Sequence, residues 1–258
     1  MPYALLSDVH GNLPALDAVL RDIRARQSDV RATYHLGDLV GYSPWPNEVV
    51  GTLRDANIFG VAGNYDSTVA ADYKHCGCRA ESPQQEALAH ISYEWTRAHV
   101  TANTKASLGA LPFRIDLRAF GGHVAGPTVV LVHATPMNNL VYVTEDRPDA
   151  FLLKMAQQAA LKSGDVLCFG HTHKPWHREV DGIHFVNTGS VGRPKDGDAR
   201  ACYVVLDIST AGATVDFVRV PYDVEHAARA VIDAALPHEF ADFLRTGGAT
   251  SPATSAEL

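Results

Sequence analysis

Two histidines separated by a single residue, His171 and His173, follow an apolar run in the stretch CFGHTHKPWH, residues 168–177. Four other apolar runs also end in a carboxylate, an amide or an imidazole. The candidates in the five runs are Asp8, His10, Asp38, Asn64, His133, His171 and His173. A lone histidine after a strand is usually a satisfied core or surface residue. Seven such side chains at five matching positions instead indicate a metal or catalytic centre.

The residue types restrict the chemistry of this centre. Carboxylates and imidazoles without thiolates suit Mn²⁺, Fe, Zn²⁺ or Ni²⁺ better than a structural zinc site, and Mn²⁺ is our first choice. In Asp8/His10 and in His171/His173, the two-residue spacing predicts side chains on one side of locally extended backbone.

An alternation of strands and helices would position these residues. Apolar runs predict strands at 3–7, 32–36, 58–62, 128–132 and 165–169, and an alternating run predicts one at 113–120. Helices are expected after the cap Asn12, from near Asn47, over 83–100, around 148–162 and over 223–236. The runs IHFVN, ACYVVLD and TVDFVRV predict neighbouring antiparallel strands. Ligands in α/β sheets bind at the carboxyl ends of strands, where the seven candidates fall.

Composition narrows the function. The chain has 258 residues, 46% of them apolar, and a formal charge of −7. The charge argues against bulk nucleic-acid binding but leaves a nucleotide or another small phosphate ester open as substrate. No leader-like or membrane-spanning run is present, and the four cysteines form no framework of a secreted domain, so we expect a cytoplasmic protein.

The chain shows no composition break that would divide it. We expect one domain over 1–244, with a helical insert or cap-like region at 67–112 and a disordered tail at 245–258. The sequence leaves a homo-oligomer open.

The ordered motifs resemble those of the calcineurin-like metallophosphoesterases, in particular a small bacterial branch of phosphodiesterase type. The motifs are Asp8-Val9-His10, Gly37-Asp38, Gly63-Asn64-Tyr65-Asp66, Val132-His133 and Gly170-His171-Thr172-His173. The resemblance implies a four-layer α-β-β-α sandwich of two mixed sheets with outer helices and a dinuclear metal site at the strand ends. Asp8, His10, Asp38 and His173 would hold one metal. Asp38, Asn64, His133 and His171 would hold the other.

The activity implied is hydrolysis of a phosphodiester through a metal-bridging hydroxide, with Asp38, Asn64, Tyr65 and Asp66 as catalytic candidates. Tyr65 stands where the family commonly has the histidine that assists the leaving group. A phenol with an ordinary pKa near 10 donates a hydrogen bond but shuttles protons poorly at pH 7. We therefore expect a preference for phosphodiesters or activated esters over alkyl monoesters, unless Tyr65 only packs beside the site.

Several alternatives stay open. The chain could be a non-catalytic scaffold of the same fold, a phosphomonoesterase or a dinucleoside polyphosphate hydrolase.

We interpret Arg193 and Lys195 as a solvated turn rather than as phosphate ligands. Tyr42 and Trp45 could line the substrate pocket or pack beneath their loop. We interpret His75, Cys76 and Cys78 as part of a loop rather than as a further metal site. Asn187 and Ser190 are expected to brace the site through hydrogen bonds to the backbone.

Overall fold

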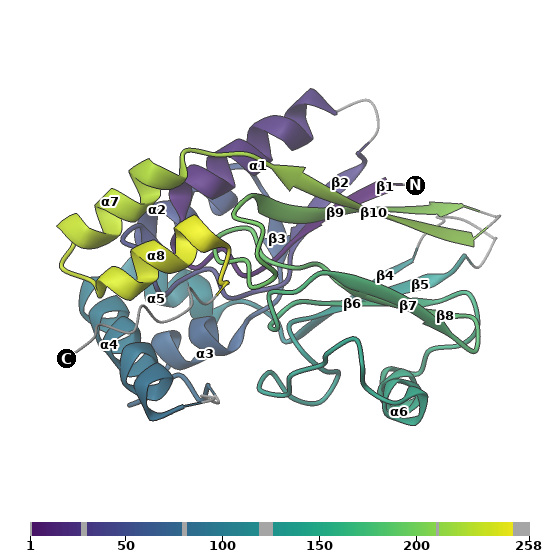
Figure 1. Ribbon diagram of the computed structural model, residues 1–258. Coiled ribbons are helices and arrows are strands. Elements are labelled where there is room, and N and C mark those ends of the chain that lie inside the picture. Colours follow the sequence, from purple (N-terminus) through teal and green to yellow (C-terminus); the bar gives the residue numbers. More distant parts are fainter. Residues whose placement is uncertain (1, 27–29, 79–81, 119–125, 210–211, 250–258) are drawn as a thin grey trace, which may run out of the picture.

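The computed structural model describes residues 2–26, 30–78, 82–118, 126–209 and 212–249, and two five-stranded sheets lie face to face in it (Figure 1). The first sheet has the order β10 (Gly212–Val220), β9 (Ala201–Ser209), β1 (Pro2–Leu6), β2 (Ala32–His35), β3 (Phe59–Gly60). The second has the order β4 (Arg114–Arg118), β5 (Thr128–Val132), β6 (Val166–Phe169), β8 (Ile183–Asn187), β7 (Trp176–Val180). Both sheets mix parallel and antiparallel pairs, as predicted.

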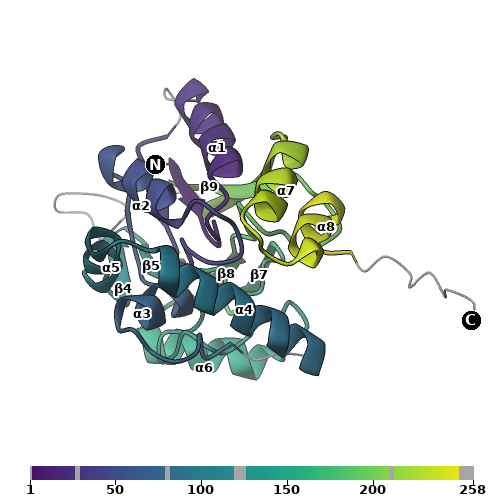
Figure 2. The ribbon, with the colours of Figure 1, turned by 90° about the vertical axis from the view of Figure 1, so that its left-hand side faces the viewer.

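Helices cover the outer faces of the two sheets. They are α1 (Leu13–Ala25), α2 (Pro46–Asp55), α3 (Asn64–Ala70), α4 (Pro83–His99), α5 (Ala102–Gly109), α6 (Asp149–Ala159), α7 (Val224–Asp233) and α8 (His238–Thr246). Helix α1 lies outside the first sheet and α6 outside the second, while α7 and α8 pack as a pair at one end (Figures 1 and 2). The predicted four-layer sandwich is confirmed.

The strands carry apolar side chains on both faces because both faces are buried. In β1, Ala4 and Leu6 pack toward the helices of the first sheet, whereas Leu5 enters the cluster between the sheets. In β5, Leu131 enters that same middle cluster and Val130 packs on the α6 side. Successive side chains of a strand point to opposite faces of the sheet and pack into two different cores. Both sets must therefore be apolar, which explains why these runs are continuously apolar.

Some predicted elements differ in detail. Strand β8 pairs with β6 and β7 in the second sheet, not with β9, so the three late runs do not form one antiparallel set. The partner β7 has the polar sequence WHREV and was not predicted. The signal for it was Asp181-Gly182, whose φ values of 50° and 73° fit a tight hairpin turn.

The start of α1 follows the predicted capping. The Asn12 side chain accepts a hydrogen bond from the Ala15 backbone N–H at 3.2 Å, with proline in the first turn. The stretch 67–112 holds most of α3 and all of α4 and α5, and its role as an insert or cap stays a prediction. Helix α8 was not predicted. It runs to Thr246, beyond the predicted end of the domain at 244, and the rest of the predicted tail, 250–258, lies outside the described residues.

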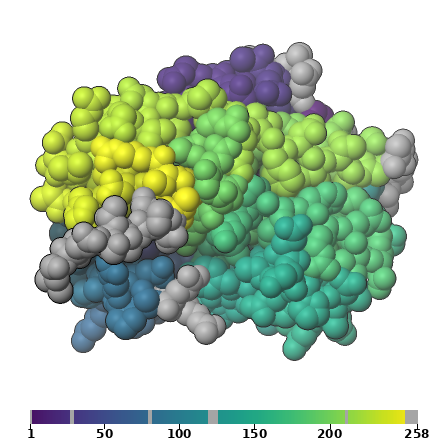
Figure 3. Space-filling view, viewed as in Figure 1, coloured from purple at the N-terminus to yellow at the C-terminus, as the bar shows by residue number. Residues whose placement is uncertain are grey.

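Within the described ranges, no helix is long and apolar enough to cross a bilayer. The space-filling view shows α7 and α8 packed against the green residues that follow β8 (Figure 3).

The middle core should dominate stability. Leu131→Ala removes a fully buried side chain between the sheets and should lower the free energy of unfolding by about 2–5 kcal/mol. Ile232→Ala, at a position 47% exposed on α7, should change it by less than about 0.5 kcal/mol. Urea unfolding followed by circular dichroism measures both, and equal losses would contradict the layered core.

Candidate metal centre

The candidate ligands lie in the loops that follow the strands, and most of these loops turn sharply. Positive φ angles occur at Asp8 (53°), His10 (47°), Asp38 (54°), His171 (68°) and His173 (61°). The prediction of locally extended backbone in the D-x-H and H-T-H motifs is therefore wrong. The side chains converge because left-handed residues redirect the chain, a conformation that costs about 1–2 kcal/mol per non-glycine residue and is typical of functional sites.

Glycines beside the ligands leave room for carboxylates. A Cβ atom on Gly63 would lie 2.1 Å from Asp38 Oδ1, and one on Gly170 would lie 2.4 Å from Asp8 Oδ2. Any larger residue would collide with an acidic ligand at these two positions. The Gly-Asn and Gly-His pairs of the sequence are therefore required by close packing around the carboxylates.

Asp8, His10 and His173 form the first triad, and the side chains are almost completely buried. His173 Nε2 lies 3.3 Å from Asp8 Oδ1 and 3.2 Å from His10 Nε2. The second Asp8 oxygen, Oδ2, accepts a hydrogen bond from the His171 backbone N–H at 3.0 Å. Asp8 is thus anchored through one oxygen and presents the other to the two imidazoles.

Asp38, His133 and His171 form the second triad, also buried. His133 Nε2 lies 3.1 Å from His171 Nδ1 and 3.2 Å from the amide oxygen of Asn64. That amide oxygen faces other acceptors, including Asp38 Oδ2 at 3.3 Å. Either the amide is turned to donate, or a cation lies among these atoms, and the second explanation suits the predicted role of Asn64 as a ligand.

Asp38 stands between the triads. Its Oδ2 atom lies 3.7 Å from His10 Nε2 and 3.6 Å from His133 Nε2. Its Oδ1 atom accepts a hydrogen bond from the Tyr65 backbone N–H at 2.9 Å. Asp38 therefore repeats the pattern of Asp8, with one oxygen anchored to backbone and the other turned toward the imidazoles.

The donor set fits divalent cations. Asp8 Oδ1 is buried and has no hydrogen-bond partner among the described residues. An orphaned carboxylate oxygen costs free energy unless a positive group meets it. Oxygen and imidazole donors without thiolate at both triads match the metals expected from the sequence.

Backbone carbonyls orient three of the four histidines. The Nδ1 atoms of His10, His133 and His173 lie 3.0, 2.8 and 2.6 Å from the carbonyl oxygens of Val40, Leu36 and Arg193. Each such ring donates its Nδ1 proton to the carbonyl and keeps an Nε2 lone pair for the centre. His171 is reversed, since its Nδ1 atom faces His133.

Burial sets the protonation of the metal-free site. It lowers the pKa of His10, His171 and His173 well below the usual value, so these imidazoles are neutral and able to donate lone pairs. Burial, followed by the charge of Asp66, raises the pKa of Asp38 well above its usual range. Burial also raises the pKa of Asp8 to about 7. Without a cation, the site therefore resists holding both carboxylates ionised.

Asp66 braces the loops around Asp38. Its two oxygens accept hydrogen bonds from the backbone N–H groups of Leu39 and Gly63, each at 2.9 Å. These contacts tie the Asp38 loop to the start of α3. Its predicted catalytic role stays a prediction, and the contacts indicate a positioning role.

The ring of Tyr65 is enclosed and only 1% exposed. It meets His10 edge-on with centroids 5.5 Å apart and also contacts Tyr42, Tyr93 and the backbone of Gly41. Burial raises its pKa well above the usual value, so the phenol stays protonated. This enclosure favours the packing interpretation of Tyr65 over a role at the leaving group.

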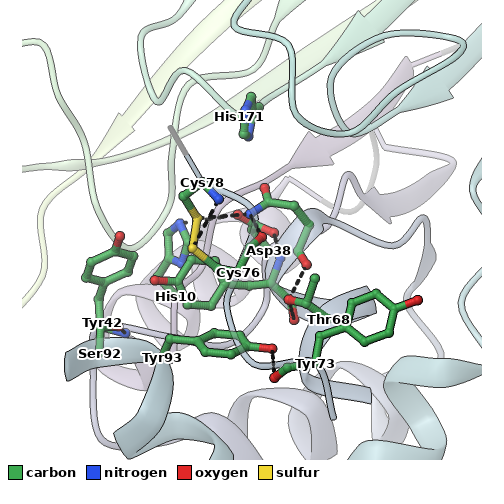
Figure 4. Close-up of a disulfide and its surroundings, with 12 residues drawn as sticks. His10, Asp38, Tyr42, Thr68, Tyr73, Cys76, Cys78, Ser92, Tyr93 and His171 are labelled. Atoms are coloured by element: carbon green, nitrogen blue, oxygen red, sulfur yellow. Dashed lines mark hydrogen bonds and ion pairs between the residues drawn. A yellow bond between two sulfur atoms is a disulfide. The ribbon is translucent and has the colours of Figure 1, made fainter. Parts of the chain in front are cut away.

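Cysteines 76 and 78 form a disulfide next to the centre (Figure 4). The Asn64 side-chain N–H₂ group lies 3.3 Å from the Cys76 carbonyl oxygen and 3.2 Å from Cys78 Sγ. These two acceptors hold the amide so that its oxygen points to the second triad. The stretch is a loop, as predicted, and His75 belongs to neither triad.

The turn after β8 braces the first triad, as predicted. Asn187 Nδ2 donates to the Gly170 carbonyl oxygen at 2.7 Å, and the Ser190 hydroxyl donates to that of Asp8 at 2.7 Å.

Sequence reasoning missed Tyr142, whose ring stacks on His171 at 4.3 Å, because no motif marks it. Of the two aromatic residues considered for the pocket, Tyr42 contacts His10 and Trp45 packs on His226 of α7.

Comparison with known proteins agrees with this arrangement. Residues 1–211 match the model of the calcineurin-like phosphoesterase superfamily domain. The chain belongs to this superfamily. It is 28% identical to the uncharacterized protein MJ0912 of Methanocaldococcus jannaschii, over 95% of this chain and 97% of that protein. It is also 28% identical to the phosphodiesterase YfcE of Escherichia coli K12, over 80% of this chain and 88% of YfcE.

A solved structure supports the same fold. The metallophosphoesterase of Sphaerobacter thermophilus superposes with a TM-score of 0.72 at 28% identity, covering 96% of this chain and 99% of that one. The recognition of the superfamily from the ordered motifs is thus confirmed. Helix α8 lies beyond the matched residues 1–211.

Replacing the shared carboxylate should separate stability from metal binding. Asp38→Asn removes a buried charge, so the metal-free protein should melt a few degrees higher. Saturating Mn²⁺ should raise the melting temperature of the unmodified protein by roughly 5–10 °C and that of the variant by much less. Differential scanning fluorimetry with and without chelator measures this. Asp55→Asn, 72% exposed in its side chain, is the control that should behave like the parent.

Tyr65→Phe distinguishes packing from proton donation. The variant keeps the ring against His10, so kcat on any phosphate ester that the protein hydrolyses should stay within about twofold. Loss of a general acid would instead lower kcat by roughly a hundredfold or more. Steady-state kinetics at matched metal loading measures the difference, and a fall of that size would restore Tyr65 as a catalytic residue.

Proposed function

We propose that this protein is a phosphodiesterase that works with two divalent cations, one at each triad. The observation that carries the proposal is the position of Asp38 Oδ2, 3.7 Å from His10 and 3.6 Å from His133. One carboxylate shared by two ligand groups is the arrangement that two-metal hydrolysis requires.

Each cation would have ligands from both sheets. Asp8, His10 and His173 with Asp38 would hold one, and Asp38, Asn64, His133 and His171 the other. Bound there, divalent cations would supply Lewis acidity, which polarises phosphate oxygens and makes hydroxide available near neutral pH. The protein would fix the ligands through the backbone contacts of Asp8, Asp38 and the imidazoles, so little reorganisation is needed when substrate binds.

The charge balance favours an anionic substrate. Two divalent cations would bring four positive charges, Asp8 and Asp38 would bring two negative ones, and the attacking hydroxide would bring a third. Asn64 and the imidazoles with lowered pKa add none. One positive charge is left in a buried space, where it attracts a phosphate diester strongly.

Tyr65, the candidate proton donor for the leaving group, does not face an open space. Tyr65 is enclosed by His10, Tyr42 and Tyr93. A site of this kind suits esters whose leaving group departs without protonation, which supports the preference for activated diesters. The likeness to the phosphodiesterase YfcE supports the same reaction class. Mn²⁺ as the native cation and a cytoplasmic location are further parts of the proposal.

Substrate preference tests the proposal. With Mn²⁺, bis(p-nitrophenyl) phosphate should be hydrolysed about tenfold or more faster than a simple alkyl monophosphate, because the first needs no general acid. EDTA should abolish the activity and Mn²⁺ should restore it. A panel that adds a dinucleoside tetraphosphate identifies the substrate class. Release of nitrophenol is measured for the diester, of phosphate for the monoester and of nucleotides for the tetraphosphate.

Two controls accompany the panel. Asp38→Asn should lower kcat/KM by roughly a thousandfold and Asp55→Asn should leave it unchanged. Faster turnover of the alkyl monoester would replace the phosphodiesterase with a monoesterase. No turnover of any ester by the metal-loaded protein would favour the non-catalytic scaffold.

A further inference from the structure

Arg193 is fixed beside the first triad through its backbone. Its carbonyl oxygen accepts a hydrogen bond from His173 Nδ1 at 2.6 Å, and its N–H group donates to the Ser190 hydroxyl at 2.8 Å. That hydroxyl in turn donates to the carbonyl oxygen of Asp8. The position of Arg193 is therefore set by the same turn that supports two ligands of the first triad.

The Arg193 side chain is held between two aromatic rings. Its Cζ atom lies 4.0 Å from the ring centroid of Tyr42 and 3.8 Å from that of Phe243. Such cation–π contacts use no N–H group as a hydrogen-bond donor to a carboxylate, so the five N–H donors of the guanidinium stay available for an anion. The sequence-based interpretation of Arg193 as part of a solvated turn is therefore wrong.

In the described part of the chain, this cation has no anionic partner. Among the described residues, no carboxylate lies within ion-pair distance of Arg193, and its side chain donates none of the observed hydrogen bonds. The nearby Arg219, also partly buried, is by contrast paired with Asp196. Burial lowers the pKa of Arg193, because water is excluded without a compensating charge. A partly buried, unpaired guanidinium is costly unless an anion reaches it.

The cation lies next to an aromatic ring that contacts the first triad. The Tyr42 ring that stacks on Arg193 also contacts the His10 ring edge-on, with centroids 5.1 Å apart. The carbonyl oxygen of Arg193 also accepts the hydrogen bond from His173 Nδ1. Arg193 thus stands directly beside the imidazoles of the first triad.

We propose that Arg193 is a substrate-binding residue whose guanidinium edge donates charge-assisted hydrogen bonds to a non-bridging oxygen of the phosphate held at the two triads. Tyr42 and Phe243 are positioning residues for that guanidinium. The inference rests on the proposed function, since the anion it identifies is the phosphate ester. It also gives α8 a role, because this helix supplies Phe243 from outside the matched superfamily domain.

The test compares Arg193→Met with Arg200→Met in the Mn²⁺-loaded protein. Arg200 lies in the same connection between β8 and β9, is exposed and pairs with Asp198. Three quantities are measured for each variant: the Mn²⁺-induced rise in melting temperature, the affinity for inorganic phosphate by calorimetry, and kcat and KM with bis(p-nitrophenyl) phosphate.

Arg193→Met should lower kcat/KM by roughly tenfold to a hundredfold and phosphate affinity by about tenfold, as loss of a charged hydrogen-bond donor predicts. The Mn²⁺-induced shift should stay as in the parent protein, and Arg200→Met should match the parent in all three quantities. Phe243→Leu, which keeps the charge but removes one ring, should raise KM with a smaller change in kcat.

Unchanged phosphate affinity and kcat/KM in Arg193→Met would overturn the inference. A lost Mn²⁺ shift would also overturn it, because Arg193 would then act through His173. If Arg193→Met does not fold, Arg193→Lys decides, since lysine keeps the charge without the planar fork. A fall of about fivefold or more in phosphate affinity supports the inference, and no fall overturns it. If the parent protein hydrolyses no ester, the proposed function fails. The phosphate affinities of the parent and of the Arg193 variants still test whether Arg193 binds phosphate.

Discussion

Two carboxylates, four imidazoles and one amide oxygen share a single buried space, and all of them present electron pairs to it. Asp8 Oδ1 and Asp38 Oδ2 lie 3.3–3.9 Å from histidine nitrogens. Such a group is stable only if positive charge enters it, because repulsion and desolvation both oppose the carboxylates. The pKa values of Asp8 and Asp38 are raised for the same reason, since a proton on a carboxyl group also removes the buried negative charge. Cation binding and the stability of the loops are therefore coupled.

The chain meets this constraint with backbone contacts rather than with further charged side chains. Each carboxylate gives one oxygen to a backbone N–H from another loop, and three imidazoles give Nδ1 to a carbonyl oxygen. Left-handed residues at five ligand positions add strain, which the surrounding hydrogen bonds offset. Gly63 and Gly170 make these contacts possible, because without a side chain their backbone can lie close to the carboxylates. Backbone groups thus fix the orientation of both carboxylates and of three of the four imidazoles.

The sequence predicted which side chains gather in the two triads, because residue types and their order along the chain carry that information. Their role as metal ligands stays a prediction. The sequence predicted the local geometry poorly, since extended and left-handed backbone place residues i and i+2 differently and no residue pattern at Asp8 or His171 distinguishes them. Strand β7 was missed because WHREV has a polar face, and α8 because HEFADFLRT is short. Arg193 was misread for a different reason. Its partners Tyr42 and Phe243 are far from it in the chain, and only tertiary packing shows that the turn is not simply solvated.

Both triads are built across the junction of the two sheets. The first takes Asp8 and His10 from the end of β1 and His173 from the end of β6, and the second takes Asp38 from the end of β2 and its histidines from β5 and β6. The hydrogen bond from His133 to the carbonyl oxygen of Leu36 also crosses from one sheet to the other. A sliding of one sheet over the other would therefore change both triads together. The close packing of the middle core, with Leu5 and Leu131 fully buried, therefore also fixes the positions of the two triads.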